Sequence, residues 1–437
     1  MLWIKYSIFW ITLSENYFPL DIKIALSIII QCFLMTGCID MELTKLELNE
    51  RRARFVALMN RRCPDWDTAV FMDNVNHYYF TGTMQDGILF IYRDGSCLYG
   101  VRRSFDRAKL ECPLEENALL QIASYRDITA SRGAELGNVY IESESTTVTA
   151  LDRLKKSFVF NSTGYMDSVI RTLRSVKSPY ELHWTRISGE KHRVLIEERV
   201  PALLREGMSE AELTGEITAE MYKLGYQGIA RFHQLQADVS VGQIGFGTNS
   251  IYPSRFNGPG GAKGGGAASP LSADGTRKLG KGDLVFVDIA FAVNGYHTDK
   301  TQVFMFGAKP PEDLVKAHRF CMEVQKRLAC RLEPGAVPSR IYADIMESLS
   351  ESELDRFMGV DNRHRVKFLG HGVGLNTDEF PVIAGGFDEP LEENMVLALE
   401  PKKGVPSIGM AGVEDTYIVT PDGGECITGG GRDIVIV

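Results

Sequence analysis

The alternation of apolar and polar residues predicts a mixture of strands and helices along the first half of the chain. Four segments show it, three typical of strands and one of a helix, at 68–73, 77–83, 138–142 and 148–158 in that order. The segment ILFIYRDGSCLYGV reads as two apolar strands joined at Asp94-Gly95, a strong hairpin signal. No residues of evident chemistry gather here, which favours a scaffold or lid domain.

A long helical pattern opens the second half. Ser178-Pro179 supplies a helix cap and a residue suited to the first turn, which places the domain boundary near Val176. Further on, the helical segments after Gly207 and after Gly335 resemble each other weakly. This echo suggests a duplicated unit of helix and sheet, although chance similarity explains it nearly as well.

The composition is that of an ordinary globular protein. The 437 residues are 44% hydrophobic and 24% charged, and the length suits two or three domains. The net charge of −9, without a basic cluster, argues against nucleic acid as a partner. The eight cysteines form no C-x-x-C pair, which in a chain of this length favours reduced thiols and a reducing compartment.

The beginning of the chain differs from the rest. Residues 24–38 form an uncharged, largely apolar run, shorter than the roughly 20 residues that a spanning helix needs. They would suit a signal peptide or a lipoprotein leader acylated at Cys38, but Glu15 and Asp21 stand where such leaders are basic, and the leader would be long. Met41 opens an ordinary amphipathic pattern, so we favour a start there, with 1–40 outside the native protein. The expectation is a cytoplasmic protein without a stable membrane partner; anchoring through 24–38 is the alternative.

Two aspartates stand in the most informative segment, LVFVDIAFAVNGYHTDKTQVFMFG. Asn294-Gly295 between two apolar runs predicts a two-residue hairpin loop. In that register Asp288 faces Thr301 and Asp299 faces Ala290, so the two aspartates are diagonal neighbours on one face, roughly 7–8 Å apart at the backbone. An aspartate in so apolar a strand is costly to bury unless it is paired or binds a metal.

Two glutamates and a histidine follow the same logic. Glu400 ends one apolar strand, Glu414 begins another, and His371 lies in the glycine-bounded stretch FLGHGVGL. Four carboxylates and one imidazole suit a hard divalent cation, with Mn²⁺ the natural candidate and Fe²⁺, Co²⁺ or Zn²⁺ as alternatives. Because four carboxylates overcharge a single ion, two ions roughly 3.5–4 Å apart are expected to share them.

These motifs resemble a known family, the pita-bread metallohydrolases, which include methionine aminopeptidase, aminopeptidase P, prolidase and creatinase. The resemblance rests on LRSVKSPYEL, NGYHTDKTQVF, GHGVGL, LALEP and VEDTYIVT. It implies an α/β (α+β) protein with a pita-bread catalytic domain at 177–437 and a smaller creatinase-like α/β domain at 41–176. It also implies a homodimer, as in the two-domain Xaa-Pro peptidase branch.

The resemblance further implies two metal ions and a role for each ligand. Asp288 would bind one metal, Asp299 and Glu414 would bridge both, and His371 and Glu400 would complete the second. A hydroxide that bridges the metals would attack the scissile carbonyl of a peptide or dipeptide, and Glu400 would shuttle the proton. Glu400 and His371 are therefore the expected catalytic residues of an Xaa-Pro-type aminopeptidase or dipeptidase.

The sequence departs from the family pattern around these ligands. The usual accessory histidines are replaced, an arginine two residues before the last glutamate is missing, and the arginine of the common D-x-T-R-T motif is also absent; the residues found there are Ser254, Lys367, Asp378, Gly412 and Gln302. Candidates for contacts with substrate are Asp378, Ser254 and His297, and His297 or His233 could stand in for a lost histidine. Two alternatives remain open: a relative with non-peptidase metal-dependent hydrolysis or lyase chemistry, and a non-catalytic peptide-binding module.

Overall fold

A computed structural model describes residues 41–437 apart from 229 and 234–236. The apolar run at 24–38, with Cys38, lies outside the described residues. Within the described part, no helix is long and apolar enough to cross a membrane. The cysteines that it includes are all free thiols.

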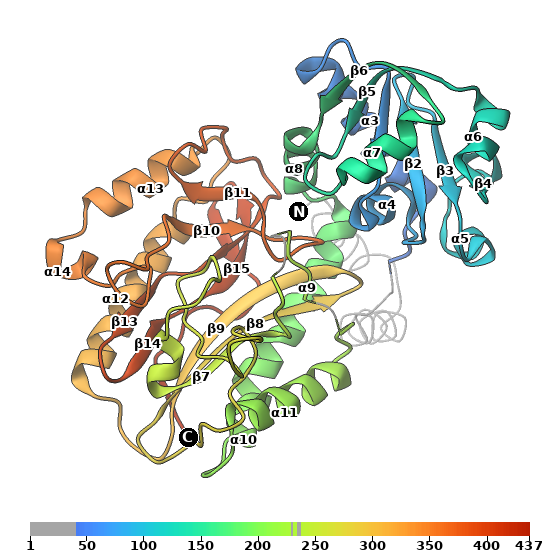
Figure 1. The fold of residues 1–437 in the computed structure, drawn as a ribbon. Helices are drawn as coiled ribbons and strands as arrows, with labels where there is room; N and C mark the ends of the chain where they lie inside the picture. The colour runs from blue at the N-terminus through green and yellow to red at the C-terminus, as the bar shows by residue number, and fades with distance from the viewer. Residues whose placement is uncertain (1–40, 229, 234–236) are drawn as a thin grey trace, which may run out of the picture. The chain divides into compact units, whose positions relative to one another are not determined.

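The N-terminal part is a mixed sheet of six strands in the order β4-β3-β2-β1-β5-β6 (Figure 1). The strands are β1 (Thr68–Phe71), β2 (Gly87–Tyr92), β3 (Cys97–Val101), β4 (Leu119–Gln121), β5 (Glu135–Ile141) and β6 (Val159–Tyr165). The helices are α3 (Lys45–Arg62), α4 (Asn74–Thr81), α5 (Phe105–Glu111), α6 (Tyr125–Arg132), α7 (Val148–Lys155) and α8 (Asp167–Ser175). Strands β2 and β3 pair antiparallel around Asp94-Gly95, so the predicted hairpin is confirmed. Val70, Phe90 and Val139 lie in a core shared with Ile128 of α6 and Leu154 of α7.

The strand predicted at 77–83 is wrong, because these residues belong to helix α4. The Asp73 carboxylate accepts a hydrogen bond from the Val75 amide at 2.7 Å and caps the helix start. Gly82 ends the helix in a left-handed conformation with φ of 77°. Strong caps at both ends outweigh the strand preference of the aromatic residues between them.

The C-terminal part contains three sheets. Their strand orders are β11-β10-β12-β15-β16, β17-β9-β8-β7 and β13-β14. The strands are β7 (Gly242–Phe246), β8 (Leu284–Val293), β9 (Tyr296–Met305), β10 (Phe368–Gly372), β11 (Glu379–Ala384), β12 (Val396–Leu399), β13 (Lys402–Val405), β14 (Gly409–Gly412), β15 (Asp415–Thr420), β16 (Gly423–Cys426) and β17 (Val435–Ile436). An isolated bridge between Thr301 and Glu414 connects the β9 sheet to the start of β15.

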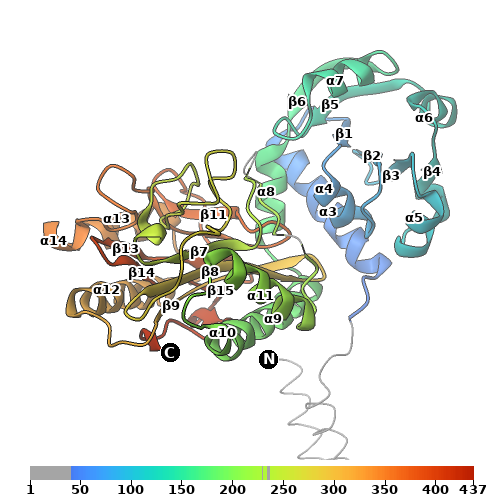
Figure 2. The same cartoon turned by 60° about the horizontal axis from the view of Figure 1, so that its bottom comes forward.

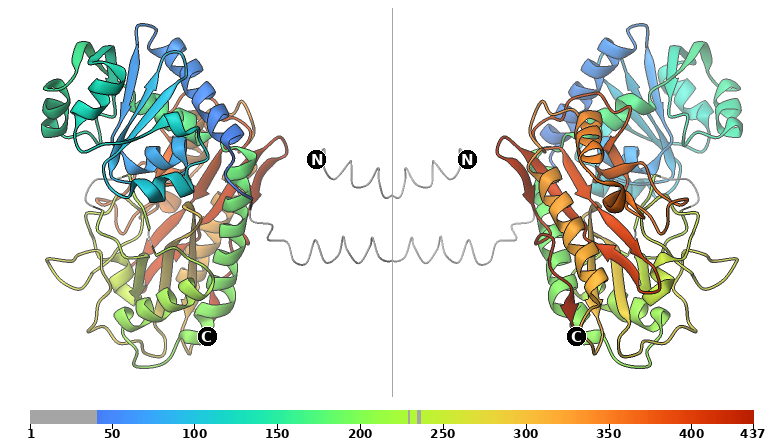
Figure 3. Two further views of the ribbon diagram at one scale, coloured as in Figure 1. Left: turned by 90° about the vertical axis from the view of Figure 1, so that its right-hand side faces the viewer. Right: turned by 90° about the vertical axis from the view of Figure 1, so that its left-hand side faces the viewer.

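Helices cover the outer faces of these sheets. They are α9 (Pro179–Val194), α10 (Val200–Leu203), α11 (Glu210–Lys223), α12 (Glu312–Ala329), α13 (Pro338–Glu347) and α14 (Glu351–Leu354). Helix α9 begins at the predicted Ser178 cap and packs along β8 and β9 (Figure 1, Figure 2). The orange helix α12 packs on β13 and β14, and it runs beside the red strands in the right-hand view of Figure 3.

Strand β8 shows how the alternation of side chains places Asp288 on the face opposite the apolar core. Val285, Val287 and Phe291 belong to the core beneath α9 and α11. Because side chains alternate along a strand, Asp288 is on the opposite face. The helices are therefore packed on one side of this strand, and a carboxylate is left on the other.

The echo between the segments at Gly207 and Gly335 has a structural counterpart. The Gly207 amide donates to Leu279 O, and the Leu279 amide donates to Met208 O, both at 2.8 Å. The same exchange joins Gly335 and Ala336 to Leu391, again with both distances at 2.8 Å. This repeated pairing at the start of α11 and of α13 supports a duplicated unit.

Candidate metal centre

All five predicted metal ligands line one cavity of the C-terminal part. Asp288 lies on β8, Asp299 on β9 and His371 on β10, while Glu400 directly follows β12 and Glu414 directly precedes β15. Residues that are more than 120 positions apart in the sequence therefore meet at one site, the aspartates from within β8 and β9 and the others from β10 and the ends of β12 and β15.

The predicted hairpin places the two aspartates. Asp288 pairs with Thr301 and Ala290 pairs with Asp299, as expected from a loop at Asn294-Gly295. Both loop residues have positive φ, 50° for Asn294 and 82° for Gly295, which is the turn that matches strand twist. The register prediction is confirmed.

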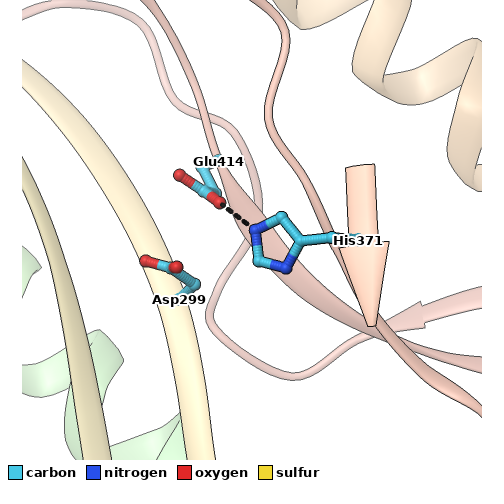
Figure 4. Close-up of side chains that lie close together, drawn as sticks. All are labelled: Asp299, His371 and Glu414. Atoms are coloured by element: carbon cyan, nitrogen blue, oxygen red, sulfur yellow. Dashed lines mark ion pairs between the residues drawn. The ribbon is translucent and has the colours of Figure 1, made fainter. Parts of the chain in front are cut away.

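Asp299, His371 and Glu414 form the tightest group. Each offers one ligand atom, and these atoms lie within 4.8 Å of one another. Figure 4 shows their side chains directed toward one another, with His371 Nε2 3.8 Å from Glu414 Oε1. Glu414 Oε1 is buried without a hydrogen-bond partner, and a buried oxygen of this kind is costly unless something binds it. A divalent ion fits this donor set.

Burial and crowding disfavour the charged forms of both aspartates. Burial is the largest cause that raises the pKa of Asp288, to about 6; Lys402 opposes it and Glu414 adds to it. The pKa of Asp299 is raised well above its usual range by burial first, and then by Glu414 and Asp288. Such a group of carboxylates gains from any cation that enters it.

One member of the centre was missed from the sequence. Lys402, the first residue of β13, is 1% exposed, and its ammonium donates to Asp288 Oδ2 at 3.0 Å, Glu400 Oε2 at 2.9 Å and Glu414 Oε2 at 2.6 Å. Burial lowers the pKa of Lys402, but the three carboxylates outweigh it and raise the pKa well above its usual range. The signal in the sequence was a lysine two residues after Glu400, a spacing that can place both side chains on one side of the chain.

The residues expected to contact substrate differ in how they are placed relative to the cavity. Asp378 lines the cavity and accepts a hydrogen bond from the His233 amide. His297 is 1% exposed and holds two loops, because its Nδ1 lies 3.1 Å from Gly374 O and its Nε2 accepts from the Arg231 amide. Ser254 Oγ accepts from an amide of its own loop, that of Phe256, and that loop reaches the cavity through Phe256.

Charged side chains of both signs line the rest of the cavity. His233 Nε2 lies 2.6 Å from Glu144 Oε2, and Arg171 donates to both Glu144 and His233. Sequence patterns did not predict that Glu144 and Arg171 take part, since both come from the N-terminal half. Lys367, which occupies a usual histidine position, is exposed.

A buried ion cluster fixes one wall of the cavity. Glu379, at the start of β11, accepts hydrogen bonds from Arg174 at the end of α8 and from Lys177 Nζ at 3.2 Å. All three side chains are at most 8% exposed. Burial acts to raise the pKa of Glu379, but Arg174 and Lys177 outweigh it and lower the pKa to about 2.

The comparison with protein families agrees with this centre. Residues 184–421 match the model of Metallopeptidase family M24, and residues 51–176 match the Creatinase/Prolidase N-terminal domain. The first match spans more than half of the chain, so the chain belongs to metallopeptidase family M24. The resemblance to the pita-bread metallohydrolases, the fold class and the assignment to a peptidase family are confirmed.

Individual relatives and solved structures agree with this family assignment. An uncharacterised peptidase of Staphylococcus aureus strain MW2 is 26% identical over 371 residues, which covers 83% of this chain and 94% of that one. The prolidase of Pyrococcus horikoshii has a TM-score of 0.71 at 22% identity, with coverage of 88% and 100%. The Xaa-Pro dipeptidase of Bacillus anthracis has a TM-score of 0.71 at 20% identity, with coverage of 89% and 100%. At these identities the two structures establish the shared fold.

Proposed function

We propose that this chain is a metal-dependent aminopeptidase or dipeptidase that hydrolyses the first peptide bond of a short peptide, with Xaa-Pro peptides as the preferred substrates. The convergence of Asp299, His371 and Glu414 in the wall of a cavity carries the proposal. The kind of bond is inferred from the structural neighbours, among them a prolidase and an Xaa-Pro dipeptidase.

A bound divalent ion would polarise the scissile carbonyl and activate water. Asp299, His371 and Glu414 would hold it, with Asp288 and Glu400 as the remaining expected ligands. Mn²⁺ is the first ion to test because carboxylate oxygens predominate among these donors. Two ions shared by five ligands is the form expected from the sequence, and Lys402 bears directly on that number.

The remaining groups of the cavity suit a short zwitterionic peptide. Arg171 can pair with a carboxylate of the substrate, and Glu144 and Asp378 can pair with an amine. Glu400 would shuttle the proton between the water and the leaving amine, and its Oε2 is held in position by Lys402. At one of the lost histidine positions, Asp378 thus binds a charged group of the substrate in this proposal.

The test is a substrate screen with matched histidine variants. Protein stripped with chelator and reloaded with Mn²⁺, Co²⁺ or Zn²⁺ is offered Xaa-Pro dipeptides, other dipeptides and longer Xaa-Pro peptides. We expect hydrolysis by the wild type and a loss of about a hundredfold or more in His371→Ala. His364→Ala is the control, since the His364 side chain is 52% exposed and pairs with Asp361 in its own turn. Absence of cleavage with every ion and peptide would refute the proposal.

Two further expectations belong to the same proposal. A homodimer follows from the two-domain branch of the family, and light scattering on the purified protein measures it directly. A cytoplasmic location follows from the cysteine usage, and fractionation of cells that produce the full chain tests it.

A further inference from the structure

The Lys402 ammonium divides the five expected metal ligands into two groups. An ammonium has three hydrogen-bond donors, and Lys402 directs them at Asp288, Glu400 and Glu414. The contacts are 2.6 to 3.0 Å long, and the side chain is 1% exposed. These carboxylates already have a cation, supplied by the chain itself.

The opposite side of the group is arranged differently. Glu400 and Glu414 each turn Oε2 toward Lys402 and Oε1 toward His371, at 3.5 Å and 3.8 Å from its Nε2. Glu414 Oε1 has no hydrogen-bond partner among the residues that the structure describes. Asp299 and His371, with Glu414, form the group whose ligand atoms converge within 4.8 Å. Each glutamate therefore faces two cation positions: Oε2 faces the Lys402 ammonium, and Oε1 faces the position of a metal ion beside His371.

The backbone at Gly412 makes room for the lysine. Lys402 pairs with Gly412 across β13 and β14. A Cβ on Gly412 would lie 2.7 Å from Lys402 Cα and 2.9 Å from Lys402 Cγ, and its φ of 140° disfavours other residues. Gly412 is also the position where the family pattern has an arginine. Position 412 thus lacks the cationic side chain of the family pattern, and the residue paired with it across β13 and β14, Lys402, carries one.

Charge and size make the lysine and a second metal ion mutually exclusive. The three carboxylate oxygens converge on Lys402 Nζ at 2.6–3.0 Å, so an ion bound by the same three oxygens at about 2.0–2.2 Å would overlap the ammonium. Four carboxylates carry −4, so one ammonium (+1) and one divalent ion (+2) leave −1, and a second ion beside the lysine would make the centre +1. Removal of the lysine would let two ions balance the four carboxylates.

Building on the proposed metal-dependent function, we propose that the Lys402 ammonium takes the place of one of the two cations. The centre then holds a single divalent ion, bound by Asp299, His371 and Glu414 with Glu400 Oε1. Lys402 acts as a positioning residue, because it fixes the orientation of both glutamates and supplies permanent charge.

Metal stoichiometry tests this inference without reference to activity. Wild type, Lys402→Met and Lys403→Met are stripped with chelator, reloaded with excess Mn²⁺, freed of unbound ion and measured by mass spectrometry. We expect about one ion per chain in the wild type and about two in Lys402→Met. Lys403→Met is the matched control, because Lys403 Nζ bonds to backbone carbonyls, among them Glu353 O at 2.7 Å, and should retain the wild-type value.

Electron paramagnetic resonance of the wild type adds a measurement that needs no variant to fold. One Mn²⁺ per chain should give the six-line signal of an isolated ion, saturating at one equivalent. About two ions in the wild type, or an exchange-coupled signal, would overturn the inference and leave the proposed function standing. One ion in both the wild type and Lys402→Met would also overturn it. No bound ion in any protein would refute the proposed function, and the inference with it.

Discussion

The buried Glu379 cluster yields a stability prediction whose dependence on pH can be worked out. Replacing Glu379 by glutamine keeps the shape of the side chain but removes the charge that Arg174 and Lys177 share. The pKa falls from the usual 4.5 to about 2 in the folded protein. Since one pKa unit corresponds to about 1.4 kcal/mol, the ionised carboxylate stabilises the fold by about 3 kcal/mol at pH 7.

The direction of the pH dependence follows from whether the folded or the unfolded state binds the proton at higher pH. A lowered folded-state pKa means that the unfolded chain is protonated at higher pH than the folded protein. The stabilisation is therefore complete above about pH 5, shrinks as the pH falls below about 4.5 and vanishes near pH 2. Glu379→Gln should lower the free energy of unfolding by about 3 kcal/mol at pH 7, and the difference from wild type should narrow on acidification.

Equilibrium urea denaturation at pH 7, 5 and 3.5 measures this difference. Glu425→Gln is the control, because Glu425 pairs with Arg186 at the surface, with both side chains 45% exposed, and such pairs contribute at most about 1 kcal/mol. A difference for Glu379→Gln below about 1 kcal/mol at pH 7, or one that stays constant down to pH 3.5, would refute the reasoning.

Two further substitutions test the turn between β8 and β9 and the buried ion pair of Lys300 with Asp415. Gly295→Ala should cost about 1 kcal/mol or more, because alanine is strained at a φ of 82°, while Gly275→Ala, with open space and no such φ, should be nearly neutral in thermal denaturation. Lys300→Met should cost about 3–5 kcal/mol, because it leaves the fully buried Asp415 without its 2.6 Å partner. An equal effect of Lys316→Met, whose lysine is 67% exposed, would contradict that explanation.

The parts of the site that the sequence predicted rest on local rules. Asn294-Gly295 selects one turn, that turn sets the register, and the register places Asp288 and Asp299 on the same face. Glu400 and Glu414 were found because they stand at the ends of apolar strands, and His371 because it lies in a glycine-bounded stretch that resembles the family motif. Helix α4 was misread because strand preference was given more weight than the Asp73 cap and Gly82.

The parts that were not predicted depend on tertiary placement. Lys402 enters the carboxylate group because β13 begins at this residue, two positions after Glu400, and pairs it with Gly412 of β14. Glu144 and Arg171 reach the cavity from the N-terminal half, and no spacing in the sequence connects them with His233. Short-range patterns carry no information about such meetings.

The facing pair of Lys402 and Gly412 has a consequence for how this centre can change by mutation. A larger residue at 412 would collide with the backbone at 402 and strain its own, whereas loss of the lysine alone would leave clustered carboxylates that repel one another until an ion arrives. Either single change is therefore expected to lower the stability of the metal-free protein. Deep mutational scanning should find these two sites intolerant one at a time, and their joint effect should differ from the sum of the separate ones.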